Sequence, residues 1–254
     1  MAADTLDILA LAAHRDDVEQ TCGGTLLKMA ERGYRIGILD LTHGEMGTRG
    51  TAEDRAREAA EAARILKAVW RQALEIPDGR VENTWENRLK VAGVLREQRP
   101  RVLILPYWEG RHPDHYTASV LGYEAAFLAG LAKLDVSAQI SDRIVAGEDS
   151  GASSPHRPFK IVYASLYRDV RPTFVVDITD QFEARFESLM AYKSQFTDQQ
   201  VGSGIFPAQA DIRARVESMA RFYGMQAGVT YAEPFVQKEM GLVDDLLAIP
   251  VKSI

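Results

Sequence analysis

Two short clusters of residues in this chain could hold a metal ion and move a proton. Residues 14–19 read His-Arg-Asp-Asp-Val-Glu, and residues 111–115 read Arg-His-Pro-Asp-His. His14 and Asp17 are three residues apart, a spacing that puts imidazole and carboxylate on one side of a turn that enters a helix. Such a pair can clamp a metal ion, while Asp16 between them would point differently.

The second cluster can complete the site. Either His112 or His115 would add a third ligand and give a His/Asp/His site, which leaves one position for water, as catalytic zinc requires. Three of the five histidines thus lie in these two clusters, and only His43 and His156 lie elsewhere.

Each cluster also has a purely structural interpretation. Asp16 or Asp17 could cap the following helix, with His14 as a hydrogen-bonded polar residue at a strand end. The second cluster could be a proline turn with incidental histidines, since fragments of this length recur by chance. Capping explains one aspartate but leaves the rest of the first cluster crowded with negative charge, so the two clusters together favour a metal site.

Alternating strands and helices position both clusters. Short apolar runs predict buried strands, and periodic stretches predict helices after them. This order predicts an α/β fold with a mostly parallel sheet covered by helices on both faces, and ligands then bind at the carboxyl ends of the strands. The predicted strands are 6–13, 35–41, 73–76, 102–105, 160–167 and 173–178, and the predicted helices are 18–31, 52–69, 85–98, 180–192 and 208–223.

Composition narrows the class of protein. The 254 residues carry 30 Lys and Arg against 36 Asp and Glu, a net charge of −6, which gives no general attraction to nucleic acid or anionic membranes. The chain shows no signal-peptide pattern at its start and no apolar run near the ~20 residues of a membrane span. We therefore expect a cytoplasmic protein, with residues 1–254 as one domain and the irregular stretch 138–158 as a surface loop that could act as a lid.

The two clusters together carry a resemblance to a known family. Residues 14–19 resemble the Ala-His-Pro-Asp-Asp-x-Glu signature of the PIG-L/LmbE-type zinc de-N-acetylases, and residues 112–115 resemble their second signature. Further stretches resemble the bacillithiol-biosynthesis deacetylases within that family: 44–50, 55–59, 191–196 and 231–235. The resemblance implies a Rossmann-like three-layer fold. It also implies hydrolysis of the N-acetyl group of N-acetyl-α-D-glucosaminyl L-malate.

The resemblance assigns roles residue by residue. It implies that His14, Asp17 and His115 bind one Zn²⁺ per subunit. It implies that Asp16 is the general base and that His112 faces the developing oxyanion. These roles are chemically sensible, because a free carboxylate beside the metal can take the proton of a polarised water and return it to the leaving amine.

Arginines would suit the malate part of such a substrate, since a guanidinium binds a carboxylate with two hydrogen bonds. Arg55 and Arg111 match the substrate-contacting positions of the family, although an arginine at the start of a helix is more often an exposed surface charge. Arg15 departs from the family pattern, which usually has proline there. It would either alter the turn and place a cation near the metal or simply point to solvent.

Several alternatives stay open. Tyr192 could donate to a substrate oxygen or pack within a helix, and Cys22 is more simply a buried core residue than a ligand or nucleophile. Fe²⁺ or Mn²⁺ would also accept the ligand set. The substrate could be another N-acetylglucosaminyl conjugate, or the chain could bind metal without turnover. The resemblance further suggests a homo-oligomer.

Overall fold

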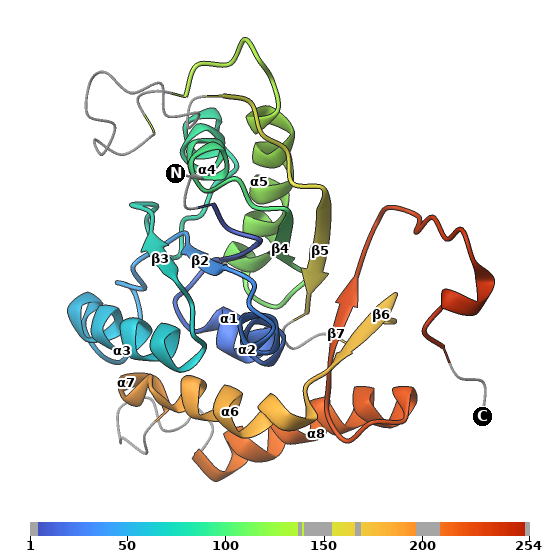
Figure 1. Ribbon diagram of the computed structural model, residues 1–254. Helices are drawn as coiled ribbons and strands as arrows, with labels where there is room; N and C mark the ends of the chain where they lie inside the picture. Colours follow the sequence, from blue (N-terminus) through green and yellow to red (C-terminus); the bar gives the residue numbers. More distant parts are fainter. Residues whose placement is uncertain (1–4, 137–138, 140–153, 166–168, 197–208, 252–254) are drawn as a thin grey trace.

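The computed structural model describes residues 5–136, 139, 154–165, 169–196 and 209–251, and its centre is one seven-stranded sheet (Figure 1). The strand order is β3-β2-β1-β4-β5-β7-β6. The strands are β1 (Ile8–Ala12), β2 (Ile36–Asp40), β3 (Trp70–Ala73), β4 (Val102–Pro106), β5 (Lys160–Ala164), β6 (Phe174–Asp177) and β7 (Ala232–Val236). The helices are α1 (Asp17–Thr21), α2 (Gly23–Glu31), α3 (Ala52–Ile65), α4 (Trp85–Gln98), α5 (Pro113–Ala129), α6 (Phe182–Met190), α7 (Lys193–Phe196) and α8 (Gln209–Ala227).

The sheet is mostly parallel, as the sequence predicts. β1, β2, β3, β4 and β5 pair in parallel, whereas β7 runs antiparallel to both of its neighbours, β5 and β6. Helices α4 and α5 cover one face, and α1, α2 and α3 cover the other, with α6 packed beneath them (Figure 1). The predicted α/β, Rossmann-like three-layer fold is therefore confirmed.

Alternate residues of the central strands build two separate core layers. Leu9 and Leu11 of β1 pack on the side of α4 and α5, while Ile8 and Ala10 pack on the side of α1 and α2. Because both faces of the strand are buried, its sequence is apolar at every position rather than at every second one. This explains why a continuous apolar run predicted the strand correctly.

The predicted helix 18–31 is interrupted in the structure. It forms two helices, α1 and α2, that meet at Cys22. The cause lies in β7, where the buried Glu233 accepts hydrogen bonds from the backbone N–H groups of Gly24 (2.9 Å) and Thr25 (2.7 Å). Glu233 thus satisfies the free N–H groups at the start of α2, which a continuous helix would have used internally.

We expect Glu233→Gln to lower the free energy of unfolding by about 1–3 kcal/mol, because the amide turns one acceptor oxygen into a donor that faces a buried N–H group. Arg185, whose Nε lies 3.0 Å from Glu233, would also lose its charged partner. Urea denaturation measures the effect, with the exposed Glu82→Gln as the matched control. Equal midpoints for the two variants would contradict the assignment.

Other boundaries also differ from the prediction. The helix predicted over 52–69 ends at Ile65, since the chain turns at Lys67, which has φ +56°. The strand predicted near 73–76 begins at Trp70, where it pairs with Gly37 of β2. Helix α5 and strand β7 were not predicted. The proposed lid at 138–158 lies mostly outside the described residues.

No helix within the described residues is both long enough and apolar enough to cross a membrane.

Candidate metal centre and active site

The two clusters meet at the carboxyl edge of the sheet. The first follows β1 directly, and the second follows β4 and opens α5. β1 and β4 are adjacent and parallel, while the chain continues from them to opposite sides of the sheet, so their ends form a topological switch point. This is the position where open α/β sheets bind ligands.

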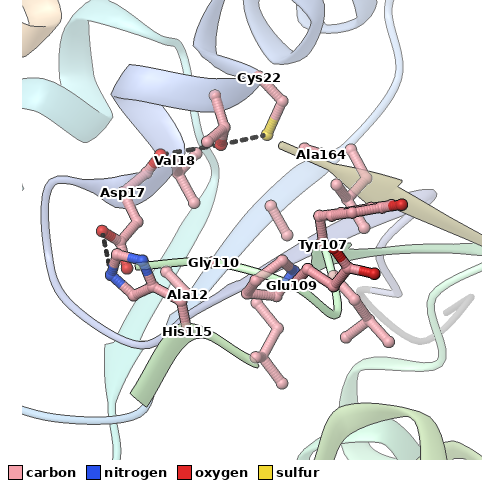
Figure 2. A pocket seen from close by; sticks show the side chains of 15 residues that line it. Ala12, Asp17, Val18, Cys22, Tyr107, Glu109, Gly110, His115 and Ala164 are labelled. Carbon is pink, nitrogen blue, oxygen red and sulfur yellow. Dashed lines mark hydrogen bonds and ion pairs between the residues drawn. The ribbon is translucent and has the colours of Figure 1, made fainter. Parts of the chain in front are cut away.

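Three side chains of the clusters point their donor atoms at one small volume. His14 Nδ1 lies 3.1 Å from His115 Nε2 and 3.6 Å from Asp17 Oδ2, and His115 Nε2 lies 3.2 Å from Asp17 Oδ1. Figure 2 shows Asp17 and His115 facing each other. Ligand atoms around a tetrahedral zinc ion lie about 3.3 Å apart, so the three donors already have the spacing that such an ion requires.

The second nitrogen of His14 is also held. His14 Nε2 lies 3.1 Å from Asp78 Oδ1 and 3.3 Å from Asp114 Oδ2. Asp114 in turn accepts backbone N–H groups of Gly79 (2.8 Å) and Val81 (3.3 Å). Carboxylates behind a histidine ligand fix its ring orientation and its tautomer, which is the usual environment of metal-binding histidines.

The electrostatics of the site favour a cation. Burial alone would lower the pKa of His14, but the carboxylates of Asp114, Asp17 and Asp78 raise it to about 12. The pKa of Asp17 is held well below its usual range by His115 and His14, despite burial. The donor set and its excess negative charge therefore fit a divalent metal ion.

Asp78 was not singled out from the sequence. It lies in a Pro-Asp-Gly turn beyond the end of β3, and only its position at the carboxyl edge of the sheet could have indicated a role. Asp114 was quoted as part of the second cluster without a function. The structure places both behind His14.

His112 lies beside the other two histidines and is exposed. Its ring is 4.8 Å from that of His14 and 5.1 Å from that of His115, centroid to centroid. Its Nδ1 accepts the backbone N–H of Asp114 (3.2 Å), which caps α5 and leaves the proton of a neutral ring on Nε2. Although the residue is exposed, partial desolvation of its ring and the neighbouring His14 and His115 lower its pKa, so the neutral ring with an Nε2–H donor is the favoured form.

Asp16 does not join the three donor residues. Its Oδ1 accepts from Arg55 Nη2 (2.9 Å) and its Oδ2 from Gln20 (3.2 Å). Arg55 is 5% exposed, so the interpretation of Arg55 as an exposed helix charge is wrong. Its guanidinium packs under Gly44, where a Cβ would come within 2.5 Å of Nη1 and where φ is +73°, so both space and conformation require glycine.

Arg111, the other predicted substrate contact, is exposed next to His112. The structure therefore separates the two arginines: one is buried against Asp16, and the other lies at the surface. Only the second is accessible from solvent.

The interpretation of Arg15 as a solvent-facing residue is also wrong. Arg15 is 7% exposed, and its guanidinium donates to the carbonyl of Ala52 (2.9 Å) and contacts His43 Nδ1 at 2.9 Å. Proline is typical of the family at this position. In this chain, Arg15 instead connects the loop between β1 and α1, here called the metal loop, to the start of α3 by a hydrogen bond.

Buried side chains also hold the backbone of the metal loop through hydrogen bonds. The carbonyl oxygen of Arg15 accepts hydrogen bonds from Arg71 Nη2 (2.5 Å) and from the hydroxyl of Tyr192. Arg71 also binds Asp40 (2.9 Å) and Glu19 (2.7 Å), and all of these side chains are nearly inaccessible. Tyr192 is thus a buried anchor of the loop and does not face a substrate.

A small pocket opens beside Asp17 and His115 (Figure 2). Its walls include the apolar Ala12, Val18 and Ala164. Cys22 also borders it but is buried, and burial raises the pKa of its thiol, so it is a core residue rather than a nucleophile.

Comparison with known proteins places this geometry in a family. Residues 9–126 match the PIG-L family profile, described as GlcNAc-PI de-N-acetylase. The conserved protein TT1542 of Thermus thermophilus has 38% identity and a TM-score of 0.80, over 95% of this chain and 99% of that one. The chain belongs to the PIG-L family.

Two relatives of this chain carry the names of two different reactions. Diacetylchitobiose deacetylase of Thermococcus kodakarensis is 29% identical over 91% of this chain and 82% of its own length. The 4-oxalmesaconate hydratase of Pseudomonas putida is 24% identical over 74% of this chain and 73% of its own length. Membership in the PIG-L family supports a deacetylase of N-acetylglucosamine-type conjugates.

Proposed function

We propose that this chain is a metal-dependent N-deacetylase that hydrolyses an N-acetylglucosaminide to acetate and the free amine. The observation that carries the proposal is the three donor atoms of His14, Asp17 and His115, 3.1–3.6 Å apart, beside the carboxylate of Asp16, which lies outside that set. A binding protein needs the ligands but not the separate carboxylate.

A zinc ion, or Fe²⁺ in its place, would supply Lewis acidity to the amide carbonyl and to a water molecule. Asp16 takes the proton of that water and returns it to the leaving amine. Arg55 Nη2 donates to Asp16 Oδ1 at 2.9 Å and so fixes the orientation of this carboxylate. The Nε2–H group of His112 donates to the developing oxyanion.

We propose N-acetyl-α-D-glucosaminyl L-malate, the bacillithiol precursor, as the substrate. The support is the resemblance of residues 44–50 and 191–196 to bacillithiol-type deacetylases, together with the exposed Arg111 next to His112. Arg55 is the second proposed substrate contact. Since its guanidinium already binds Asp16, Arg111 has the better access to a malate carboxylate.

The test measures acetate and amine release from this compound, from diacetylchitobiose and from free N-acetylglucosamine, with metal-loaded protein. Two results together support the proposal. The unmodified chain prefers the malate compound, and Arg111→Ala raises the KM for this compound but not for the other two. Equal activity on all three keeps deacetylation and rejects malate, and metal binding without any release of acetate rejects deacetylation.

We expect Asp78→Asn to weaken metal affinity by about 10- to 100-fold, because the amide no longer offers its full acceptor charge to His14 Nε2. Competition with a chelator measures the affinity directly, without reference to activity. Asp211→Asn, on the exposed surface of α8, is the control. An unchanged affinity would mean that Asp114 alone orients His14.

Three further expectations belong to this proposal. We propose that residues 1–254 form one catalytic domain, that the enzyme is cytoplasmic and that it is a homo-oligomer. Its partner is a small N-acetylglucosaminide, and neither nucleic acid nor a membrane is needed.

A further inference from the structure

A loop after β2 contacts one of the carboxylates behind His14. This loop, residues 42–50 and here called the β2 loop, begins where β2 ends at the carboxyl edge of the sheet. β2 lies between β1 and β3 and runs parallel to both, so the segments that follow all three strands leave the sheet at the same edge. The segment after β1 carries His14, and the segment after β3 carries Asp78. The β2 loop therefore begins between these two residues.

The β2 loop and Asp78 hold each other by two hydrogen bonds. The backbone N–H of Asp78 donates to Glu45 Oε1 (2.7 Å), and Asp78 Oδ2 accepts the backbone N–H of Met46 (3.0 Å). The first bond fixes the backbone of Asp78, and the second fixes one oxygen of its carboxylate. The other oxygen, Oδ1, is thereby directed at His14 Nε2, 3.1 Å away.

A tight turn presents both groups to Asp78. The backbone N–H of Gly47 donates to the carbonyl of Gly44 (3.2 Å), so Glu45 and Met46 are the two central residues of a four-residue turn. The side chain of the first central residue and the N–H of the second reach the same partner. The turn therefore binds Asp78 at two points.

Both ends of the β2 loop are anchored to other parts of the chain. At its start, the buried Thr42 donates its hydroxyl proton to the carbonyl of Ala13 (3.0 Å). At its end, Arg49 Nη1 donates to the carbonyl of Gln195 in α7 (3.1 Å), and Gln195 Nε2 donates to the carbonyl of Arg49 (2.6 Å). A loop held at both ends can fix the position of a residue that it binds.

Asp78 depends on the β2 loop more than Asp114, the second carboxylate behind His14, does. Asp114 lies in the first turn of α5 and accepts the backbone N–H groups of Gly79 (2.8 Å) and Val81 (3.3 Å). Asp78 lies beyond the end of β3, outside every helix and strand. Its position is therefore set by hydrogen bonds rather than by regular backbone structure.

We propose that Glu45 is a positioning residue of the metal centre, which acts through Asp78 on the orientation of His14. This inference rests on the metal binding of the proposed function but not on the identity of the substrate. Glu45 is exposed, so water can satisfy the N–H group of Asp78 when the side chain of Glu45 is removed. A water molecule does not anchor that group to the β2 loop. Removal of the side chain is therefore expected to weaken metal binding with little change in stability.

The first experiment measures the affinity of the full chain for Zn²⁺ alone, by competition with a chelator. Glu45→Ala is expected to lower the affinity by about tenfold, the lower end of the effect of groups behind a metal-binding histidine. Glu45→Gln keeps an oxygen that can accept the same N–H group, so it is expected to lose less affinity. Glu75→Ala replaces an exposed glutamate three residues before Asp78 and, as the matched control, is expected to bind Zn²⁺ like the unmodified chain. Urea denaturation of the metal-free proteins is expected to give equal midpoints for Glu45→Ala and Glu75→Ala.

The second experiment tests whether Glu45 acts through Asp78. Asp78→Ala removes the carboxylate but keeps the N–H group that Glu45 binds. In a chain that already carries Asp78→Ala, Glu45→Ala is expected to cause only a small part of the loss that it causes alone, because the carboxylate that it positions is absent. Such coupling is typical of residues in one hydrogen-bond network, whereas independent residues give losses that multiply in full. Losses that multiply in full would overturn the proposal.

The outcomes separate this inference from the proposed function. If the unmodified chain bound no Zn²⁺, both would be wrong. If it bound Zn²⁺ and Glu45→Ala bound it equally well, Glu45 would not position the metal centre, while the proposed function would stand. A lowered midpoint of Glu45→Ala, together with a loss of affinity that Glu45→Gln does not reduce, would also overturn the inference, because the residue would then support the fold in general.

Discussion

Asp16→Asn is expected to lower kcat by about 10²- to 10⁴-fold while the protein keeps its metal, since this is the usual contribution of a general acid–base group. Asparagine has nearly the same shape but cannot take a proton. Asp16 lies 2.9 Å from Arg55 and outside the three donor residues, so its replacement leaves the metal ligands in place. Acetate release and metal content, measured on the same preparation, test both parts.

Asp17→Asn is the matched control, because it makes the same replacement of a carboxylate oxygen by an NH₂ group in the neighbouring aspartate. It is expected to lose metal and activity together, since Asp17 lies 3.2 Å from His115 Nε2 and 3.6 Å from His14 Nδ1. If Asp16→Asn lost metal as Asp17→Asn does, Asp16 would be a ligand and not a base. If it kept both metal and full activity, the proposed proton transfer would be wrong.

The meeting of the two clusters was predictable from the sequence. Apolar runs identify β1 and β4, and parallel strands of one sheet end at one edge, so polar residues after both strands are expected near one another. The residues that interrupt this local pattern were not predictable. Glu233, which interrupts the helix after β1, lies 209 residues beyond Gly24 in the sequence. No periodicity in residues 18–31 indicates this interruption.

The surroundings of the metal loop show the same limit. The partners of the Arg15 carbonyl are Arg71 and Tyr192, which are 56 and 177 residues away in sequence. Asp78 reaches His14 from a turn beyond β3. Spacing within a motif predicts ligands that share one turn, whereas the side chains that hold the turn come from separate elements and become visible only in the folded chain.

The anchor beneath the loop leads to the second large effect. Arg71→Met is expected to lower the free energy of unfolding by about 3–5 kcal/mol, because it leaves the buried carboxylates of Asp40 and Glu19 without their cation. The side chain of Arg71 is 9% exposed, and those of Asp40 and Glu19 are at most 2% exposed. Water therefore cannot hydrate the two carboxylates once their cation is removed. Urea denaturation of the metal-free protein measures the loss without a contribution from metal binding.

Two further variants separate charge from geometry. Arg71→Lys keeps the cation, but a single ammonium cannot reach Asp40, Glu19 and the Arg15 carbonyl as the planar guanidinium does, so an intermediate loss is expected. Arg64→Met removes an exposed arginine that pairs with Glu61 on α3 and is expected to leave the midpoint unchanged. If Arg71→Met were no less stable than Arg64→Met, the buried ion pairs would not support the loop. If Arg71→Lys matched the unmodified chain in both stability and metal affinity, charge alone would be sufficient there, and the three-way hydrogen bonding of Arg71 would not position the metal ligands.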